Sequence, residues 1–212
     1  MEKMEHIGKA VLDYRFYPED DKYTDGAIED EMLEIARNCA PERYERVIVE
    51  KKSWPILYHF SYLRENIIRW LPMDGSENVL EIGAGPGAIT GALCEKGRQV
   101  TVIDLSKKRC LINAYRHKDC DNLHFLVGNF QDIEPKLTEQ YDLITLIGVF
   151  EYAQFSIQSE DPFVDYLKRI RTHLAKGGRL VIAIENRIGL KYWAGATEDH
   201  TGIYFEGREQ CD

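Results

Sequence analysis

The chain has 212 residues, of which 44% are hydrophobic and 30% are charged, and its formal net charge is −9 at pH 7. These proportions are typical of a soluble globular protein, and the acidic balance argues against a nucleic-acid partner, because such partners require a basic face. No stretch is long and apolar enough for a membrane helix, so no membrane partner is expected. The five cysteines form no metal-type pair, and the first six residues do not resemble a secretion signal. We therefore expect a cytoplasmic protein with free thiols and no metal.

The first part of the chain, residues 1–52, shows no clear alternation of strand and helix patterns, and we interpret it as a helical N-terminal extension. Apolar residues at helical spacing predict one helix over 27–38. The remaining residues, 53–212, are predicted to form the main domain. This domain begins with a second helix, which Ser53 caps and Pro72 ends.

From Asn78 onward the pattern alternates between strands and helices. Strands rich in Val, Ile and Leu are expected near 78–82, 99–103, 123–127, 141–147 and 179–185. Helices are expected near 87–96, 106–117 and 162–175. Apolar strands joined by helical crossovers predict a mostly parallel, doubly wound α/β sheet of the Rossmann-like kind, flanked by helices. In such sheets ligands bind beyond the carboxyl ends of the strands.

The most informative motif follows the first of these strands, where Glu81 precedes the loop Gly83-Ala84-Gly85-Pro86-Gly87. Glycine tolerates unusual backbone dihedrals and lets a ligand approach the backbone closely. Three alternating glycines between a strand and a helix predict a loop that lies against a nucleotide-like cofactor. A tight turn without a ligand would need only one of them.

Further residues at the carboxyl ends of strands extend the predicted binding edge. Asp104 ends the second strand, where a carboxylate can accept hydrogen bonds from both hydroxyls of a ribose. Its alternative role, a helix cap, is already offered by Ser106. Asn129 ends the third strand, where an amide can hydrogen-bond a base edge while Phe130 covers its face; an ordinary Asx turn is the alternative. Gly148 follows the fourth strand at the same edge.

Two cofactors suit a glycine loop that is followed by an acidic ribose ligand. Residues 83–88 also satisfy the dinucleotide pattern G-x-G-x-x-A. Glu81 argues against a dinucleotide, because an anionic side chain beside the loop would repel a pyrophosphate but would suit a cation. S-adenosylmethionine carries an ammonium and a sulfonium and no phosphate, so it is the cofactor that we expect.

Residues 78 to about 185 resemble the class I S-adenosylmethionine-dependent methyltransferases. The resemblance comprises the glycine loop, Asp104, the segment around Asn129 and the run from Tyr141 to Tyr152 along the fourth strand. The chain departs from the family pattern at Tyr152, where many relatives have histidine, and at Asn129, where relatives often have aspartate. The resemblance implies these cofactor-binding residues: Glu81, Gly83, Ala84, Gly85, Gly87, Asp104, Leu105, Asn129, Phe130, Ile147 and Gly148. Tyr58 and Arg64 join this set because they lie on the helix before the first strand, near enough to close over the cofactor, where Arg64 could pair with its carboxylate or be solvated on the helix surface.

The flanking segments 23–26, 58–66 and 185–195 resemble bacterial methyltransferases associated with glycosyltransferases and surface polysaccharide synthesis. This resemblance implies a small-molecule or carbohydrate acceptor, with O-methylation as the expected reaction. A hydroxyl acceptor needs a base within hydrogen-bond reach. The predicted catalytic residues are Glu151, Tyr152 and His59, with Glu185 and His200 as further candidates.

The chain that follows the fifth strand is short for the antiparallel hairpin with which the sheet of this family usually ends. We therefore expect an incomplete C-terminal hairpin and an open sheet edge, covered by the N-terminal segment or by the second subunit of a homodimer. Two other functions stay open at this point. One is a non-catalytic methyltransferase-like binding domain, and the other is an NAD-dependent oxidoreductase.

Overall fold

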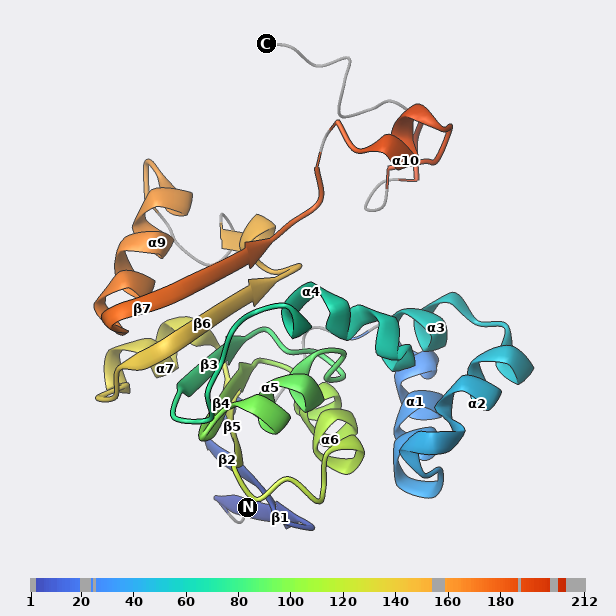
Figure 1. Cartoon of the computed structure of the whole chain (residues 1–212), viewed down its shortest axis with the longest axis horizontal. Coiled ribbons are helices and arrows are strands. Elements are labelled where there is room, and N and C mark those ends of the chain that lie inside the picture. The colour runs from blue at the N-terminus through green and yellow to red at the C-terminus, as the bar shows by residue number, and fades with distance from the viewer. Residues whose placement is uncertain are drawn as a thin grey trace.

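The structure is a computed structural model that describes residues 3–19, 24, 26–153, 159–186, 188–198 and 202–204. Within these residues seven strands form one sheet in the order β1-β2-β5-β4-β3-β6-β7 (Figure 1). The strands β1 and β2 pair antiparallel, and every other neighbouring pair is parallel. The strands are β1 (Met4–Ile7), β2 (Ala10–Phe16), β3 (Asn78–Ile82), β4 (Gln99–Asp104), β5 (Leu123–Gly128), β6 (Tyr141–Ile147) and β7 (Leu174–Ala183).

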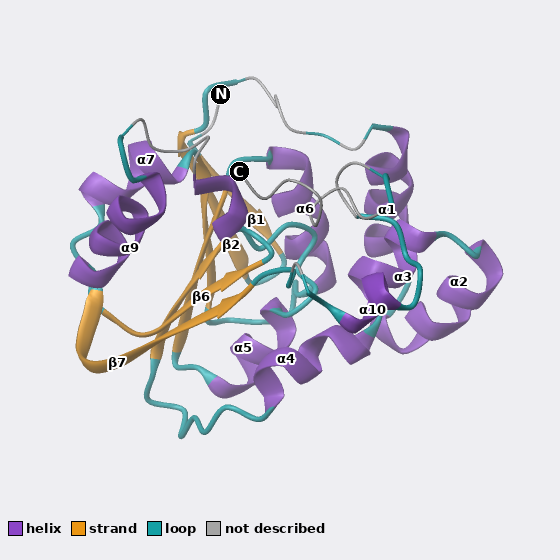
Figure 2. Ribbon diagram, turned by 90° about the horizontal axis from the view of Figure 1, so that it is seen from above, coloured by secondary structure: helices purple, strands orange, loops and turns teal. Residues whose placement is uncertain are grey.

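Helices cover both faces of this sheet, as Figures 1 and 2 show. Alternate strand residues point to opposite faces, and because both faces are buried the central strands read as continuous apolar runs. One face packs with α4, α5 and α6, and the other with α7 and α9. The helices are α1 (Ala27–Asn38), α2 (Tyr44–Lys51), α3 (Trp54–Phe60), α4 (Asn66–Arg69), α5 (Thr90–Lys96), α6 (Lys107–Arg116), α7 (Phe130–Ile133), α9 (Pro162–Thr172) and α10 (Leu190–Trp193).

The predicted parallel sheet is confirmed, and several of the predicted element boundaries differ from the structure. The helix expected from Ser53 to about 71 breaks at Ser61, whose backbone is extended and whose hydroxyl accepts a hydrogen bond from the Leu63 amide at 3.3 Å. The last strand begins at Leu174 instead of 179, because Gly177 and its neighbour bulge within the strand and do not end the preceding helix.

The hairpin β1–β2 was not anticipated, because the segment that contains it was interpreted as a helical extension. It joins the sheet through parallel pairing of β2 with β5. Its turn uses Gly8 at φ 60, where a Cβ would come within 2.3 Å of the Lys118 carbonyl oxygen. Its second strand buries the charged Asp13, which disguises the apolar pattern. Burial raises the pKa of this carboxyl, but the hydrogen bonds and charge of Arg15 outweigh it and leave the pKa below its usual value.

The outer edge of β7 carries no paired strand among the described residues. The N-terminal segment lies at the opposite edge of the sheet, so the expectation that it covers this one is wrong. Two apolar side chains, Ile182 and Ile184, are 39% and 51% exposed there. Coverage by a second subunit stays a prediction, and His200 and the tail 205–212 lie outside the described residues.

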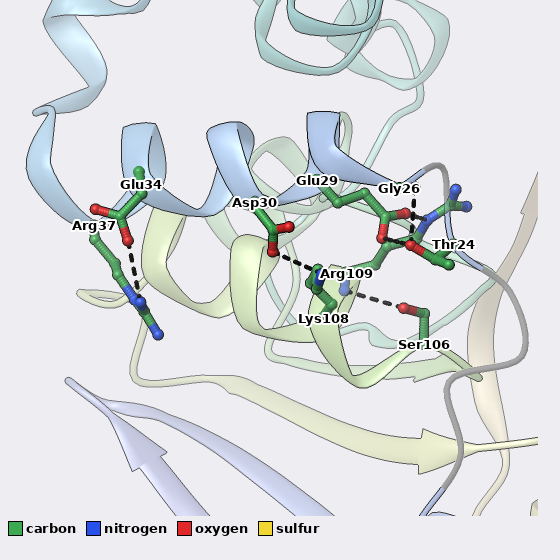
Figure 3. A network of polar contacts seen from close by, with 9 residues as sticks. All are labelled: Thr24, Gly26, Glu29, Asp30, Glu34, Arg37, Ser106, Lys108 and Arg109. Carbon is green, nitrogen blue, oxygen red and sulfur yellow. Dashed lines mark hydrogen bonds and ion pairs between the residues drawn. The ribbon is translucent and has the colours of Figure 1, made fainter.

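The three helices α1, α2 and α3 form a unit, which we call the cap, with a core of its own on the outer side of α6 (Figure 1). From the sheet domain, Ile112 of α6 is fully buried in that core. Two ion pairs fasten α1 to the beginning of α6, as Figure 3 shows: Arg109 donates to Glu29, and Lys108 donates to Asp30, each at 2.7 Å. None of the helices in the described residues is long and apolar enough to span a bilayer.

Candidate active site

The glycine loop between β3 and α5 forms the centre of the candidate site, and its three glycines have different surroundings. Gly83, Gly85 and Gly87 all have positive φ, at 70°, 53° and 80°. A Cβ on Gly83 would come within 2.4 Å of the Val149 side chain, and one on Gly87 within 2.3 Å of the Asn113 amide. A Cβ on Gly85 would meet no heavy atom within 4 Å. The first and third glycines therefore allow close packing of the protein, whereas Gly85 faces open space.

Asp104 joins this loop to the end of β4. One carboxylate oxygen accepts a hydrogen bond from the Gly85 amide at 2.7 Å, and the other accepts one from the Ser106 amide at 2.9 Å. The hydroxyl of Ser106 caps α6 by accepting from the Arg109 amide at 3.3 Å. The carboxylate is thus held beside Gly85, while the capping role that could have explained it falls to the neighbouring serine.

Glu81 lies under the loop, on the face of the sheet that α5 and α6 cover. It is 2% exposed and accepts a hydrogen bond at 2.7 Å from the hydroxyl of Thr90, which itself accepts from the Asn113 amide at 2.9 Å. Burial raises the pKa of the Glu81 carboxyl to about 8, and the nearby Asp104 charge adds to this effect. A cation placed beside Glu81 would favour its ionised form.

A second open position lies at the end of β6, the strand that pairs with β3. Gly148 has φ 67, and a Cβ on it would meet no heavy atom within 4 Å. Ile147 precedes it, and the amide of Gly148 donates to the Ala183 carbonyl at 2.7 Å, which fixes this turn against β7. The short 3-10 helix Phe150–Tyr152 follows, and in it one carboxylate oxygen of Glu151 is buried without a hydrogen-bond partner among the described residues.

Of the residues that follow β4 and β5, Leu105 and Asn129 are exposed and Phe130 is buried. Leu105 is 43% exposed beside Asp104. The side-chain oxygen of Asn129 accepts from the Gln131 amide at 3.3 Å, which is the Asx-type turn named above as the alternative. Phe130 is 7% exposed, with its ring centroid 5.1 Å from that of Tyr166. The beginning of α7 packs this ring against Tyr166, and its contact with a ligand stays a prediction.

Three predicted residues come from α3 of the cap and from the short 3-10 helix Tyr62–Glu65 that follows it. The guanidinium of Arg64 lies 4.0 Å from the centroid of the Tyr58 ring, and its Nε is buried without a partner in the described part of the chain. The ring of Tyr58 packs perpendicular to that of His59 at 5.0 Å. Burial, together with the charges of three arginines, lowers the pKa of His59 to about 3. His59 is therefore neutral and a very weak base.

Four side chains that hold the glycine loop and Glu81 in place were not predicted from the sequence. Val149 fills the space above Gly83, Asn113 fills the space beside Gly87, and Thr90 bonds to Glu81. Arg116 donates to the Pro86 carbonyl at 2.5 Å. The positions of Thr90 and Asn113 relative to the glycine motif carried a weak signal, since α5 and α6 must pack under the loop. Val149 and Arg116 carried none. Among the described residues no group of His, Cys, Asp and Glu is arranged to hold a metal ion.

A parallel sheet with a glycine loop after one strand and a carboxylate after the next defines a Rossmann-like nucleotide-binding fold. Residues 80–180 match the family model of the methyltransferase domain. This part of the chain is therefore similar to class I methyltransferase domains, whose cofactor is S-adenosylmethionine.

Individual relatives agree with this family. An uncharacterized methyltransferase of Staphylococcus carnosus (strain TM300) is 29% identical, over 72% of this chain and 67% of the relative. A protein-L-isoaspartate O-methyltransferase of Dictyoglomus turgidum (strain DSM 6724 / Z-1310) is 26% identical, over 84% of this chain and 77% of the relative. The fold is shared with phosphoethanolamine N-methyltransferase 1 of Haemonchus contortus, solved with phosphoethanolamine and S-adenosylhomocysteine. That likeness has a TM-score of 0.52 at 19% identity, and it covers 74% of this chain and 34% of that one.

Proposed function

We propose that the chain is an S-adenosylmethionine-dependent methyltransferase that methylates a hydroxyl of a small-molecule or carbohydrate acceptor. The observation that carries the proposal is the open space in front of Gly85 and Gly148. These glycines follow the neighbouring strands β3 and β6 at the same edge of the sheet. Glycines with positive φ and open surroundings also occur elsewhere, for example Gly75 and Gly177. Gly85 and Gly148 differ from these by their place after neighbouring parallel strands, where sheets of this kind bind ligands and a ligand can approach the backbone closely.

The residues around this space suit the parts of the cofactor, whose sulfonium supplies the methyl group when it is bound. The carboxylate of Asp104, held beside Gly85, would accept hydrogen bonds from the ribose hydroxyls. Leu105 offers an exposed apolar surface for the adenine ring, and the exposed Asn129 lies at the end of the next strand. Ile147 and Ala84 would line the remaining wall by virtue of their places beside the two open glycines.

The charged end of the cofactor would lie between Glu81 and the segment after the cap. Glu81 suits an ammonium group, because a cation would stabilise the ionised form of a carboxyl that burial keeps neutral. A pyrophosphate at the same place would meet an acidic group instead, which disfavours a dinucleotide. Arg64, stacked on Tyr58 and with a buried Nε without a partner among the described residues, suits the carboxylate of the methionine part.

For the acceptor we assign the general base to Glu151, because its buried carboxylate oxygen lacks a partner among the described residues and follows the open position at Gly148. Tyr152, its neighbour, would orient the acceptor hydroxyl. A neutral His59 with a pKa of about 3 suits a hydrogen bond to the acceptor better than proton removal. Glu185 already accepts hydrogen bonds from Tyr192 at 3.1 Å and from Lys191 at 3.2 Å, so we give it no role.

Methyl transfer from labelled S-adenosylmethionine tests this proposal. The protein is incubated with a panel of sugars, small phenols and small amines, and the labelled product is identified by mass spectrometry. Label on the oxygen of a sugar or phenol is the expected result. Label on the amines alone would overturn O-methylation, and tight S-adenosylhomocysteine binding without transfer to any acceptor would favour a non-catalytic binding domain.

A further inference from the structure

Arg116, the last residue of α6, touches both the glycine loop and the core of the cap. Its Nη1 donates a hydrogen bond to the Pro86 carbonyl oxygen at 2.5 Å. On its other side, Cζ of the guanidinium lies 4.6 Å from the centroid of the Phe60 ring and 5.7 Å from that of Tyr44. Phe60 and Tyr44 pack edge to face at 4.8 Å and belong to the core of the cap. A single side chain therefore bridges the two parts.

The other polar contacts between cap and sheet domain act elsewhere. The ion pairs of Arg109 with Glu29 and of Lys108 with Asp30 hold the beginning of α1 against the beginning of α6 (Figure 3). These pairs join helix to helix, whereas Arg116 joins the cap to the loop itself. The cap is thus fastened at the beginning of α6 by ion pairs and at its end by the Arg116 guanidinium.

The guanidinium of Arg116 and the hydroxyl of Tyr44 lie close enough for each to shift the pKa of the other. The Nε of Arg116 and the hydroxyl of Tyr44 are both buried without a partner of good hydrogen-bond geometry in the described part of the chain. Burial lowers the pKa of Arg116 to about 10, and the nearby Tyr44, Glu65 and Glu81 act in the opposite direction. The guanidinium is therefore charged at neutral pH and stabilises the partial charge of the loop carbonyl.

We propose that Arg116 is a positioning residue that couples the seating of the cap to the conformation of the glycine loop. Through it, a cap seated on α6 holds the loop in the shape that leaves Gly85 open, and a cofactor against that loop favours the seated cap. Such coupling is reciprocal by thermodynamic necessity. The inference rests on the proposed function for its consequence in catalysis, but the coupling itself is a property of the protein alone.

The first experiment measures the coupling without a cofactor. Phe60→Leu removes the aromatic surface on which the guanidinium lies, at a site that does not touch the loop. We expect faster hydrogen exchange in the peptide that contains residues 83–89, measured by mass spectrometry, in addition to faster exchange in the cap. Unchanged exchange in the loop peptide would overturn the coupling, whether or not the protein binds S-adenosylmethionine.

The second experiment measures the consequence for binding. Arg116→Met should weaken S-adenosylhomocysteine binding about tenfold or more and raise KM for S-adenosylmethionine more than it lowers kcat. Arg116→Lys, which keeps a cation that can reach the Pro86 carbonyl, should recover part of the loss. Arg179→Met is the matched control, because Arg179 donates to the Pro72 carbonyl at 2.7 Å. That bond lies before β3, away from the loop.

A double-mutant cycle completes the test. The effects of Phe60→Leu and Arg116→Met on S-adenosylhomocysteine affinity should be clearly less than additive, because each removes the same bridge. Additive effects would overturn the proposal, as would wild-type affinity in a folded Arg116→Met variant. If Arg116→Met does not fold, Arg116→Lys takes its place in the cycle with the same two outcomes. Absence of binding by the wild-type protein would refute the proposed function, and the exchange experiment would still decide the coupling.

Discussion

Replacement of Glu81 by glutamine should change how cofactor affinity depends on pH. Burial raises the pKa of this carboxyl to about 8. About 1% of it is then ionised at pH 6 and about half at pH 8. If the ammonium of the ligand binds the ionised form, this group alone strengthens binding about 50-fold between pH 6 and pH 8, which is about 2 kcal/mol. Glutamine has the same shape and does not titrate.

The assay is calorimetric titration of both proteins with S-adenosylhomocysteine from pH 6 to pH 8. The ligand's own amino group also titrates near this range, but identically for both proteins, so the ratio of the two dissociation constants isolates Glu81. We expect the advantage of the wild type over Glu81→Gln to grow with pH. Adenosine, which lacks the methionine part, should give a constant ratio. A constant ratio for S-adenosylhomocysteine as well would refute the placement of the ammonium beside Glu81.

The same pKa predicts that the stability of the fold decreases as pH rises, whereas cofactor affinity increases. A carboxyl whose pKa is raised in the folded state stabilises the fold fully below its unfolded value of about 4.5. That contribution is lost as pH rises through about 8. In urea denaturation the wild type should therefore lose stability relative to Glu81→Gln across this range. A pH-independent difference would show that the carboxyl is ionised throughout.

Three further substitutions test other parts of the site. Gly85→Ala should abolish S-adenosylhomocysteine binding in a folded protein. Gly177 is an equally open position with φ 83 on the edge strand β7, and Gly177→Ala should leave binding unchanged. Equal affinities of the two variants would contradict the assignment of Gly85 to the cofactor site. Glu151→Gln should slow methyl transfer about 100-fold with cofactor affinity retained, and undiminished turnover would exclude it as the base. Arg109→Met should cost about 3–5 kcal/mol in urea denaturation, because it leaves the buried Glu29 carboxylate without its cation. Adding Glu29→Gln to the Arg109→Met variant should restore part of the lost free energy of unfolding. If it does not, the loss comes from the packing of the Arg109 side chain.

The strands of the sheet were predictable because each carries its signal within a few residues. β3 and β6 begin and end where their apolar runs do, and the Ser106 cap and the Asp161 cap mark α6 and α9. The hairpin β1–β2 was not predictable in the same way. Its first strand has only four residues, and the buried Asp13 of the second is explained only by its partner in the folded chain.

The candidate site was predictable in its backbone and less so in its side chains. The glycine motif and Asp104 come together because the carboxyl ends of neighbouring parallel strands meet at one edge. Which glycine faces a ligand depends on packing by Val149 and Asn113, which lie far along the chain. The packing of the Phe130 ring against Tyr166 was not predictable, because a residue after a strand can turn to either side, and the beginning of α7 decides the direction.

The most direct test of the account is a parallel titration of the wild-type protein and Asp104→Ala with S-adenosylhomocysteine and with NAD. We expect one saturable site for S-adenosylhomocysteine in the wild type, its loss in the variant, and no binding of NAD by either protein. Binding of NAD in preference to S-adenosylhomocysteine, or full affinity for S-adenosylhomocysteine in a folded Asp104→Ala, would contradict the central claim.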